Sequence, residues 1–218
     1  MFYFLLGSIF GSFGHVLVSR LTSRENFLTG RSRCDACQQQ LAAYDLLPIV
    51  SYFILRGKCR HCATLIPKSI LLLEIFSGLL LFFSLSCWHS WLIFFWLFTA
   101  LLLSLEDFWT QQVDLRLLLI SQIILLIAYG FTGSIWHLET LGLAVIFLGG
   151  LFLVAGRKIG LADLLLLLFW SPLFHMEHWL MLIIVASLSG LLFSRANQPL
   201  PFIPFLSFAL VITLIIAK

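Results

Sequence analysis

The stretch "GRKIGLADLLLLLFW", Gly156 to Trp170, places two basic residues and a single carboxylate, Asp163, directly before a run of five leucines. The leucines suit the hydrocarbon core of a membrane, whereas an ionisable side chain within a membrane helix costs about 3 kcal/mol. The stretch therefore predicts a membrane helix that begins close to an aspartate, and the role of that aspartate needs an explanation.

The composition of the chain extends this prediction to the whole protein. Of 218 residues, 61% are hydrophobic and 11% are charged, against about 25% charged residues in soluble domains, which excludes a soluble globule. We predict an all-α polytopic membrane protein, because eight apolar stretches approach the length that crosses a bilayer. These stretches are 1–19, 69–87, 91–107, 115–130, 138–155, 161–174, 177–194 and 202–217.

The first stretch, "MFYFLLGSIFGSFGHVLVS", has no basic segment before its apolar core and no small-residue cleavage site after it. It is predicted to be a retained helix and not a removable signal peptide. We expect three parts in the chain: the first transmembrane helix (1–19), a polar module (20–68) and a membrane-embedded domain (69–218).

The basic residues predict the orientation, because Lys and Arg are retained in cytoplasmic loops. With the N-terminus outside and eight crossings, twelve of the thirteen fall inside and only Lys218 lies outside. The twelve are Arg20, Arg24, Arg31, Arg33, Arg56, Lys58, Arg60, Lys68, Arg116, Arg157, Lys158 and Arg195. The net charge of +3 thus reflects membrane orientation, and no nucleic-acid partner is expected.

The module at 20–68 contains two C-x2-C pairs separated by 21 residues, Cys34 with Cys37 and Cys59 with Cys62. Four thiolates at this spacing predict a tetrahedral, structural zinc site, since a cytoplasmic module rarely forms disulfides. Four reduced thiols without a metal, or a redox pair, are the alternatives. We expect His61 to be an exposed polar residue and Cys87 a small apolar packing residue.

Five carboxylates lie in or near the predicted membrane helices: Glu74, Glu106, Asp107, Asp114 and Asp163. Asp107 ends the third helix and Asp163 begins the sixth, so both are expected at the cytoplasmic boundary. Two carboxylates brought together there could share a proton, with one activating water and the other protonating a leaving amine. The alternative is structural: Asp163 as a helix N-cap and Asp107 solvated at the interface.

Several motifs resemble the type IV prepilin peptidases, membrane aspartic proteases of the GxGD type, and in particular the short forms of Gram-positive competence systems. "GSFGHVLVSRL" is similar to the family's N-terminal motif, and "SRCDACQQQLAAYDLLPIVSYFILRGKCRHCATLIP" to its tetracysteine loop. "EDFWTQQVD" resembles D-x5-P-[DN], "GLAD" resembles GxGD, and "PFIPFL" resembles the motif before the last helix. The likeness extends over nearly the whole chain.

The resemblance implies a protease that removes the basic leader of a prepilin or pseudopilin helix at the cytoplasmic membrane face of a bacterium. It places the catalytic aspartates at Asp107 and Asp163, with Gly160, Ala162 and Asp114 in the supporting loops. It further implies N-methylation of the new N-terminus from S-adenosylmethionine. We expect Gly57 and Lys58 in the module to take part in this methylation. Glu74, at the family's acidic position, is expected to have a methyltransferase or structural role. The expected partners are the prepilin helix and the lipid bilayer.

Two positions depart from the family's motifs. Val113 replaces the usual Pro, and Ala162 replaces the second Gly of GxGD. Since Ala resists positive φ, a differently shaped loop before Asp163 and slower cleavage are expected. Three other interpretations remain open: a lipid-linked transferase whose acids hold Mg²⁺, a non-catalytic membrane scaffold, and a prepilin peptidase inactivated at Ala162.

Overall fold

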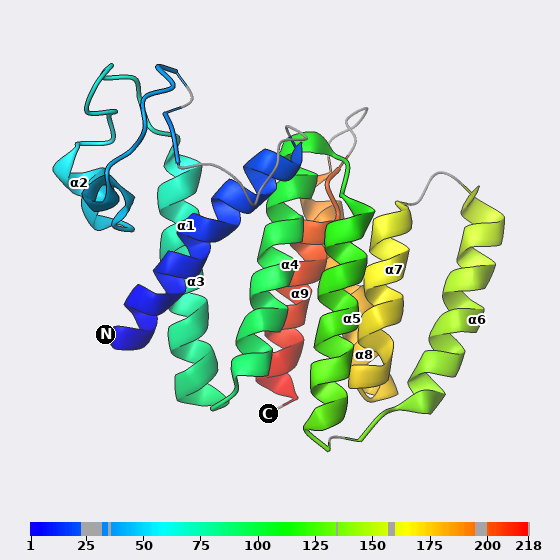
Figure 1. Cartoon of the computed structure of the whole chain (residues 1–218). Helices are drawn as coiled ribbons and strands as arrows, with labels where there is room; N and C mark the ends of the chain where they lie inside the picture. The colour runs from blue at the N-terminus through cyan, green and yellow to red at the C-terminus, as the bar shows by residue number, and fades with distance from the viewer. Residues whose placement is uncertain (23–31, 35, 134, 157–159, 195–199, 218) are drawn as a thin grey trace. The chain divides into compact units, whose positions relative to one another are not determined.

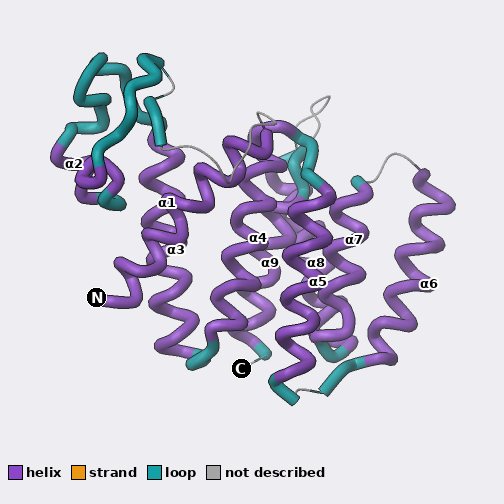
Figure 2. The backbone as a smooth tube through the Cα atoms, in the orientation of Figure 1, coloured by secondary structure: helices purple, strands orange, loops and turns teal. Residues whose placement is uncertain are grey.

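A computed structural model of the chain describes residues 1–22, 32–34, 36–133, 135–156, 160–194 and 200–217, apart from the side chain of Ala155. In this part the regular structure is entirely helical, with two isolated β-bridges in the module (Figures 1 and 2). The predicted all-α class is therefore confirmed. The long helices are α1 (Phe2–Thr22), α3 (Lys68–Cys87), α4 (Trp91–Thr110), α5 (Leu115–Phe131), α6 (Leu138–Ala155), α7 (Leu161–Trp170), α8 (Met176–Phe193) and α9 (Ile203–Ile216).

Each of these eight helices coincides within a few residues with one of the eight predicted apolar stretches. Four of them, α1, α3, α4 and α8, are long and apolar enough to cross a membrane. The other four are apolar but shorter. Helix α7, with 10 residues, is about 15 Å long, half the thickness of a hydrocarbon core. Four helices thus meet the length and composition that a crossing requires, and the eight crossings themselves stay a prediction.

The structure divides into two units, Met1–Phe94 and Phe95–Lys218, and the division falls inside α4. Unit 1 contains α1, the module and α3; unit 2 contains most of α4 and all helices that follow. These units follow packing, whereas the predicted boundaries at 19/20 and 68/69 follow polarity along the sequence. The three-part division therefore stays a prediction.

In unit 1, α1 and α3 pack with their backbones in close approach. A Cβ on Gly7 would lie 2.5 Å from the carbonyl oxygen of Ser77. A Cβ on Gly11 would overlap the hydroxyl of Ser77, and one on Gly78 would lie 2.9 Å from the carbonyl oxygen of Phe4. Small residues four apart let membrane helices approach closely. The GSIFG segment therefore determines where α1 packs on α3, the helix that follows the module in the chain.

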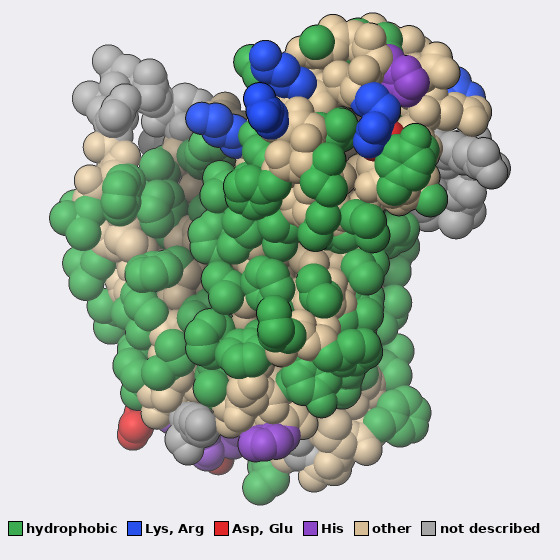
Figure 3. Space-filling view, turned by 90° about the vertical axis from the view of Figure 1, so that its left-hand side faces the viewer, with side chains coloured by type: hydrophobic (Ala, Val, Ile, Leu, Met, Phe, Trp, Pro, Cys, Tyr) green, Lys and Arg blue, Asp and Glu red, His purple; other side chains and the backbone are tan. Residues whose placement is uncertain are grey.

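Two short elements lie between α1 and α3: the 3₁₀ turn η1 (Ala43–Leu46) and helix α2 (Val50–Ile54). Figure 3 shows Lys and Arg side chains gathered over this module, while apolar side chains cover the membrane helices beneath it. On α3 the exposed apolar residues include Phe76, Phe82 and Phe83. An apolar helix surface of this kind is suited to contact with lipid, because the hydrocarbon chains of lipid do not require polar side chains on the protein surface.

In unit 2, buried aromatic residues and a few polar groups form the contacts between helices. The indole of Trp170 donates to Gln122 on α5 at 2.9 Å, and that of Trp179 donates to the carbonyl of Leu167 at 3.1 Å. The hydroxyls of Ser104 on α4 and Ser207 on α9 lie 2.7 Å apart. A short 3₁₀ turn, η3 (Ser171–Leu173), reverses the chain between α7 and α8. The N-terminus of α7 therefore lies at the opposite end of unit 2 from that of α8.

Candidate active site and metal centre

The four module cysteines converge on one point. The sulfurs of Cys34, Cys37, Cys59 and Cys62 all lie within 4.8 Å of one another, and none of the four forms a disulfide. The Sγ atoms of Cys34 and Cys62 are 3.8 Å apart. Four sulfurs placed tetrahedrally about 2.3 Å from a zinc ion would be separated by about 3.8 Å. The cluster can therefore hold a metal ion, and its geometry fits the predicted structural zinc; the metal's identity stays a prediction.

The two cysteine pairs are built as repeats of one turn. In the first, the amide of Gln38 donates to the carbonyl of Cys34 at 2.8 Å, and in the second the amide of Ala63 donates to that of Cys59 at 3.0 Å. The residue after each second cysteine has positive φ, 58° at Gln38 and 57° at Ala63. Hydrogen bonds from the Thr64 hydroxyl and amide lower the pKa of Cys62 to about 6. This favours a thiolate, the form that binds metal.

Arg60 links the turn of the second cysteine pair to the rest of the module. Its guanidinium donates to Oδ1 of Asp45 at 2.7 and 3.1 Å and lies 4.8 Å from the ring centre of Tyr44. The Asp45 carboxylate raises the pKa of Arg60 further above its usual range. His61, between the last two cysteines, is exposed, as predicted. The module is thus held together through its polar side chains, because few of its apolar side chains are buried in the described residues.

Glu74 connects the module to the membrane helices of unit 1. Its side chain is buried on α3, and Oε2 accepts from the backbone amide of Ile49 at 2.7 Å. The Ser12 hydroxyl of α1 is a second partner. Ile49, which precedes α2, has φ of 62° and ψ of −51°, a conformation that a β-branched residue adopts at a cost. The carboxylate therefore stabilises a strained turn of the module against α1 and α3.

The other two residues for which a methyl-transfer role was predicted lie side by side in the module. Gly57 is buried with φ of 68°, and a Cβ there would lie 3.0 Å from the Tyr52 ring. Lys58 is exposed, and its backbone pairs with Leu65. The contacts of Gly57 and Glu74 thus explain why a glycine and a glutamate occupy these two positions. No structural contact of the described residues explains the lysine at Lys58 in the same way.

Asp107 lies in the last turn of α4, where its side chain is buried. Its Oδ2 accepts from the amide of Ile203 at 3.1 Å, and the amide of Phe202 is a second donor. These amides begin α9, and the first amides of a helix have no partner within it. Asp107 therefore caps α9 across the unit. The sequence predicted a likeness at "PFIPFL" but not this contact, because the donors are backbone groups.

Asp163 lies in the first turn of α7 and is half-buried. It is not the N-cap: that position belongs to Gly160, and Asp163 makes no capping hydrogen bond. The N-cap alternative is therefore wrong. A Cβ on Gly160 would lie 2.6 Å from Oδ2 of Asp163. The missing side chain at Gly160 leaves the space that the carboxylate occupies.

Asp107 and Asp163 lie at the same end of unit 2, where α4 ends and where α7 and α9 begin, and close enough for their charges to interact. The sequence-predicted pair is thus brought together.

Asp114 has a different role: it is the N-cap of α5, with Oδ1 accepting from the Arg116 amide at 2.7 Å. Glu106 is buried, accepts from the backbone amide of Asp114 and leaves Oε2 without a partner among the described residues.

Ala162 does not distort the approach to Asp163. It belongs to the first turn of α7 and has no positive φ. A helical position favours Ala over Gly by about 0.5–1 kcal/mol. Ala162 is therefore unstrained in the described residues, which begin again at Gly160, and the expected difference in loop shape from the family's motif stays a prediction.

Residues 5–89 match the family model described as the Bacterial Peptidase A24 N-terminal domain. The matched segment contains most of α1, the tetracysteine module, Glu74 and all of α3. The predicted resemblance to type IV prepilin peptidases is confirmed by the relatives named below.

Three relatives illustrate the match. A protein of Myxococcus xanthus named prepilin leader peptidase/N-methyltransferase is 38% identical over 82 residues, 38% of this chain and 24% of that protein. A Bacillus subtilis protein of the same name is 34% identical over 59 residues, 27% of this chain and 24% of that protein. An Escherichia coli type 4 prepilin-like proteins leader peptide-processing enzyme is 27% identical over 106 residues, 45% of this chain and 39% of that protein.

The chain thus spans about a quarter to two fifths of the length of these relatives. Asp107 and Asp163 lie beyond the segment that the family model matches. No solved structure gives a significant match to the chain.

The cysteine geometry predicts one tightly held metal ion per chain. Zinc content of the purified protein, measured by elemental analysis, is expected to be close to one per chain and to fall in the Cys59→Ser and Cys62→Ser variants. Cys87→Ser is the matched control, because Cys87 lies at the end of α3 outside the cluster. Zinc retained in full by both cluster variants, or lost equally in Cys87→Ser, would contradict the assignment.

Proposed function

We propose that the chain is a membrane-embedded aspartic endopeptidase that removes the leader of type IV prepilins or pseudopilins, with Asp107 and Asp163 as its catalytic pair. The observation that carries the proposal is the meeting of these two carboxylates at one end of unit 2. The names of the relatives supply the reaction, since several are prepilin leader peptidases. Assignment to the short competence type rests on the sequence motifs alone.

The surroundings of the two carboxylates suggest how they divide the reaction. Two backbone amides at the N-terminus of α9 point at Asp107 and stabilise a negative charge there. No donor to Asp163 is found in the described part of the chain. The dipoles of α4 and α7 alone would favour the charge on Asp163, at the start of α7, but the amides at the start of α9 act directly on Asp107.

In the proposed reaction the charged Asp107 accepts a proton from water, whose oxygen bonds to the carbonyl carbon of the scissile peptide. Asp163 donates its proton to the leaving nitrogen as the carbon–nitrogen bond breaks. The released leader carries the new carboxylate, and the mature pilin carries the new amine. One proton enters the pair and one leaves it, so the shared proton is restored after each cycle.

We propose the bacterial plasma membrane as the location, with the N-terminus outside and the module and catalytic pair on the cytoplasmic side. Arg33, Arg56, Lys58, Arg60 and Lys68 in the module support this orientation through the retention of basic residues inside. Of the basic residues in the prediction, Arg24, Arg31, Arg157, Lys158, Arg195 and Lys218 lie outside the described residues.

The substrate class follows from the relatives' names and from the depth of the pair: a basic leader joined to a membrane helix. The basic module does not attract a basic leader, and we assign its charge to anionic lipid headgroups, which attract clustered Lys and Arg. The hydrophobic part of the substrate is then left to the apolar helix surfaces.

We further propose N-methylation of the new N-terminus, with S-adenosylmethionine as methyl donor. The name N-methyltransferase in the relatives supports this activity. The methyl group moves from the donor's sulfonium to the amine, which releases a proton. Lys58 is the exposed candidate near the donor, whereas Glu74 and Gly57 act by shaping the module around it.

The rival interpretations are less well supported. A metal-dependent transferase needs several carboxylates around one ion, yet no three carboxylates lie close enough together to share an ion in the part of the chain described here. Asp107 and Glu106 are instead engaged by backbone amides. A scaffold gives no reason for a glycine that clears space for an aspartate.

Replacement of either catalytic aspartate is expected to abolish leader removal. In cells that co-express a prepilin, Asp107→Asn and Asp163→Asn should each lower cleavage by roughly 100-fold or more, because each loses a proton-transfer group. Mass spectrometry of the pilin N-terminus reports leader removal and the added methyl group together. Glu139→Gln, at the opposite end of unit 2, is the matched control and should cleave normally.

Normal cleavage by both Asn variants would overturn the assignment of the pair.

Gly160 and Ala162 should respond in opposite ways to exchange of a single methyl group. Gly160→Ala places a Cβ against the Asp163 carboxylate and should lower cleavage at least about 10-fold, because small displacements of a catalytic group are costly. Ala162→Gly should leave cleavage unchanged or slightly lower, since it only weakens the first turn of α7. A rise in cleavage in Ala162→Gly would show that Ala162 limits the enzyme.

A further inference from the structure

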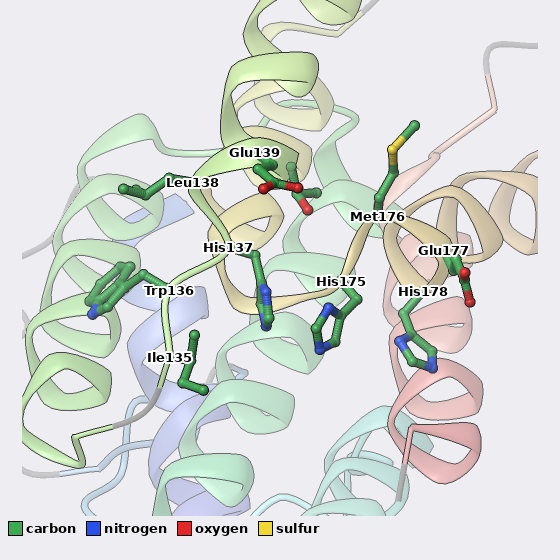
Figure 4. Close-up of a pocket in the computed structure, with 10 residues that line it drawn as sticks. Ile135, Trp136, His137, Leu138, Glu139, His175, Met176, Glu177 and His178 are labelled. Carbon is green, nitrogen blue, oxygen red and sulfur yellow. The ribbon is translucent and has the colours of Figure 1, made fainter.

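A second polar site lies at the other end of unit 2, away from the aspartates. A cavity of about 620 Å³ opens there between the chain leading into α6 and the chain leading into α8. Three histidines and two glutamates are among its lining residues: His137, His175, His178, Glu139 and Glu177 (Figure 4). None of these has a part in the proposed cleavage.

Two of these imidazoles precede different helices and lie close together. His137 precedes α6 and His175 precedes α8, and their ring centres are 3.8 Å apart. His178, in the first turn of α8, has its ring centre 6.3 Å from that of His175. Two imidazoles bound to one tetrahedral ion, with metal–nitrogen distances of 2.0–2.1 Å, have ring centres about 5 Å apart. Small side-chain rotations therefore bring neighbouring rings to ligand distance.

The charges around the cavity favour a cation. Glu139 and Glu177 lie in the first turns of α6 and α8. Acidic side chains are favoured at these positions by the positive ends of the helix dipoles. An anion would be repelled by them, whereas a cation gains two nearby negative charges.

We propose that this cavity binds one divalent transition-metal ion, with the imidazoles of His137 and His175 as its first two ligands. His178 supplies a third nitrogen and water the fourth position, with the carboxylates balancing the charge. Imidazole nitrogen together with carboxylate suits Zn²⁺, Ni²⁺ or Cu²⁺ and not Mg²⁺ or Ca²⁺, which take oxygen ligands. The thiolate cluster of unit 1 is a separate site of different chemistry.

The ion would tie α6 to the rest of unit 2. Helix α6 lies at the edge of unit 2 beyond α7 (Figure 1), and its surface is apolar and largely exposed, as at Ile146, Leu153 and Val154. One link at this end is already present, because the amide of His137 donates to the carbonyl of Pro172 in η3 at 2.9 Å. A metal bridge between His137 and His175 would strengthen that link, and this role does not depend on the proposed protease activity.

The test uses the full chain in detergent micelles, loaded with one equivalent of zinc for the cysteine cluster and freed of excess zinc by dialysis. Equilibrium dialysis against Ni²⁺ followed by elemental analysis should show one bound nickel per chain. His137→Gln and His175→Gln should each weaken nickel binding by roughly 10-fold or more, as expected when a ligand is lost. His89→Asn is the matched control: His89 is exposed in the turn between α3 and α4 and should bind nickel as the unaltered chain does.

A second measurement needs no substitution and stands if a variant fails to fold. Nickel should slow hydrogen exchange of backbone amides in residues 135–141 of the unaltered chain, because the ion fixes the start of α6. Absence of a bound nickel, an affinity for nickel in both Gln variants equal to that of the unaltered chain, or nickel binding that leaves exchange in 135–141 unchanged would each overturn the proposal.

Discussion

A carboxylate buried among apolar helices must find a hydrogen-bond donor, and the rest of this structure depends on how that is done. An ionised side chain within a membrane helix costs about 2.5–3.5 kcal/mol, and a hydrogen bond to a charged group returns about 1.5–3 kcal/mol. Here the donors are backbone amides at turns and helix starts. Ile49 donates to Glu74 in unit 1, and Ile203 donates to Asp107 in unit 2.

These contacts do more than offset the cost of burial, because each joins two parts of the chain. Glu74 fixes the turn before α2, and with it the metal-binding module, to α3. Asp107 fixes the start of α9 to the end of α4. Asp163 is the contrast: its carboxylate lies in space that Gly160 leaves open, without a donor among the described residues. A carboxyl group without a fixed partner is the one best able to carry and release a proton.

Much of the fold could be predicted because hydrophobicity is read along the sequence. The lengths of the apolar stretches gave all eight long helices within a few residues, and the C-x2-C spacing gave a cluster with the sulfur separation of a tetrahedral site. Both signals are local. They require no knowledge of which helices become neighbours.

What escaped prediction depends on tertiary contacts or on helix boundaries. The capping of α9 by Asp107 joins residues about a hundred positions apart through backbone amides, which carry no sequence signal. Whether Ala162 is strained depended on where α7 begins, and a start at Leu161 makes Ala a favourable residue there. The pairing of His137 with His175 likewise required the η3 turn to bring two helix starts together.

The central claim is that Asp107 and Asp163 form one site, and proximity can be measured without any assumption about the substrate. In a Cys87→Ser background with the cluster cysteines protected by zinc, Asp107→Cys and Asp163→Cys are combined and treated with a short bismaleimide. Peptide mass spectrometry should then find the two positions cross-linked, while Asp107→Cys combined with Glu139→Cys at the opposite end of unit 2 should not be linked. Equal cross-linking of the two pairs, or none in the first, would contradict the account.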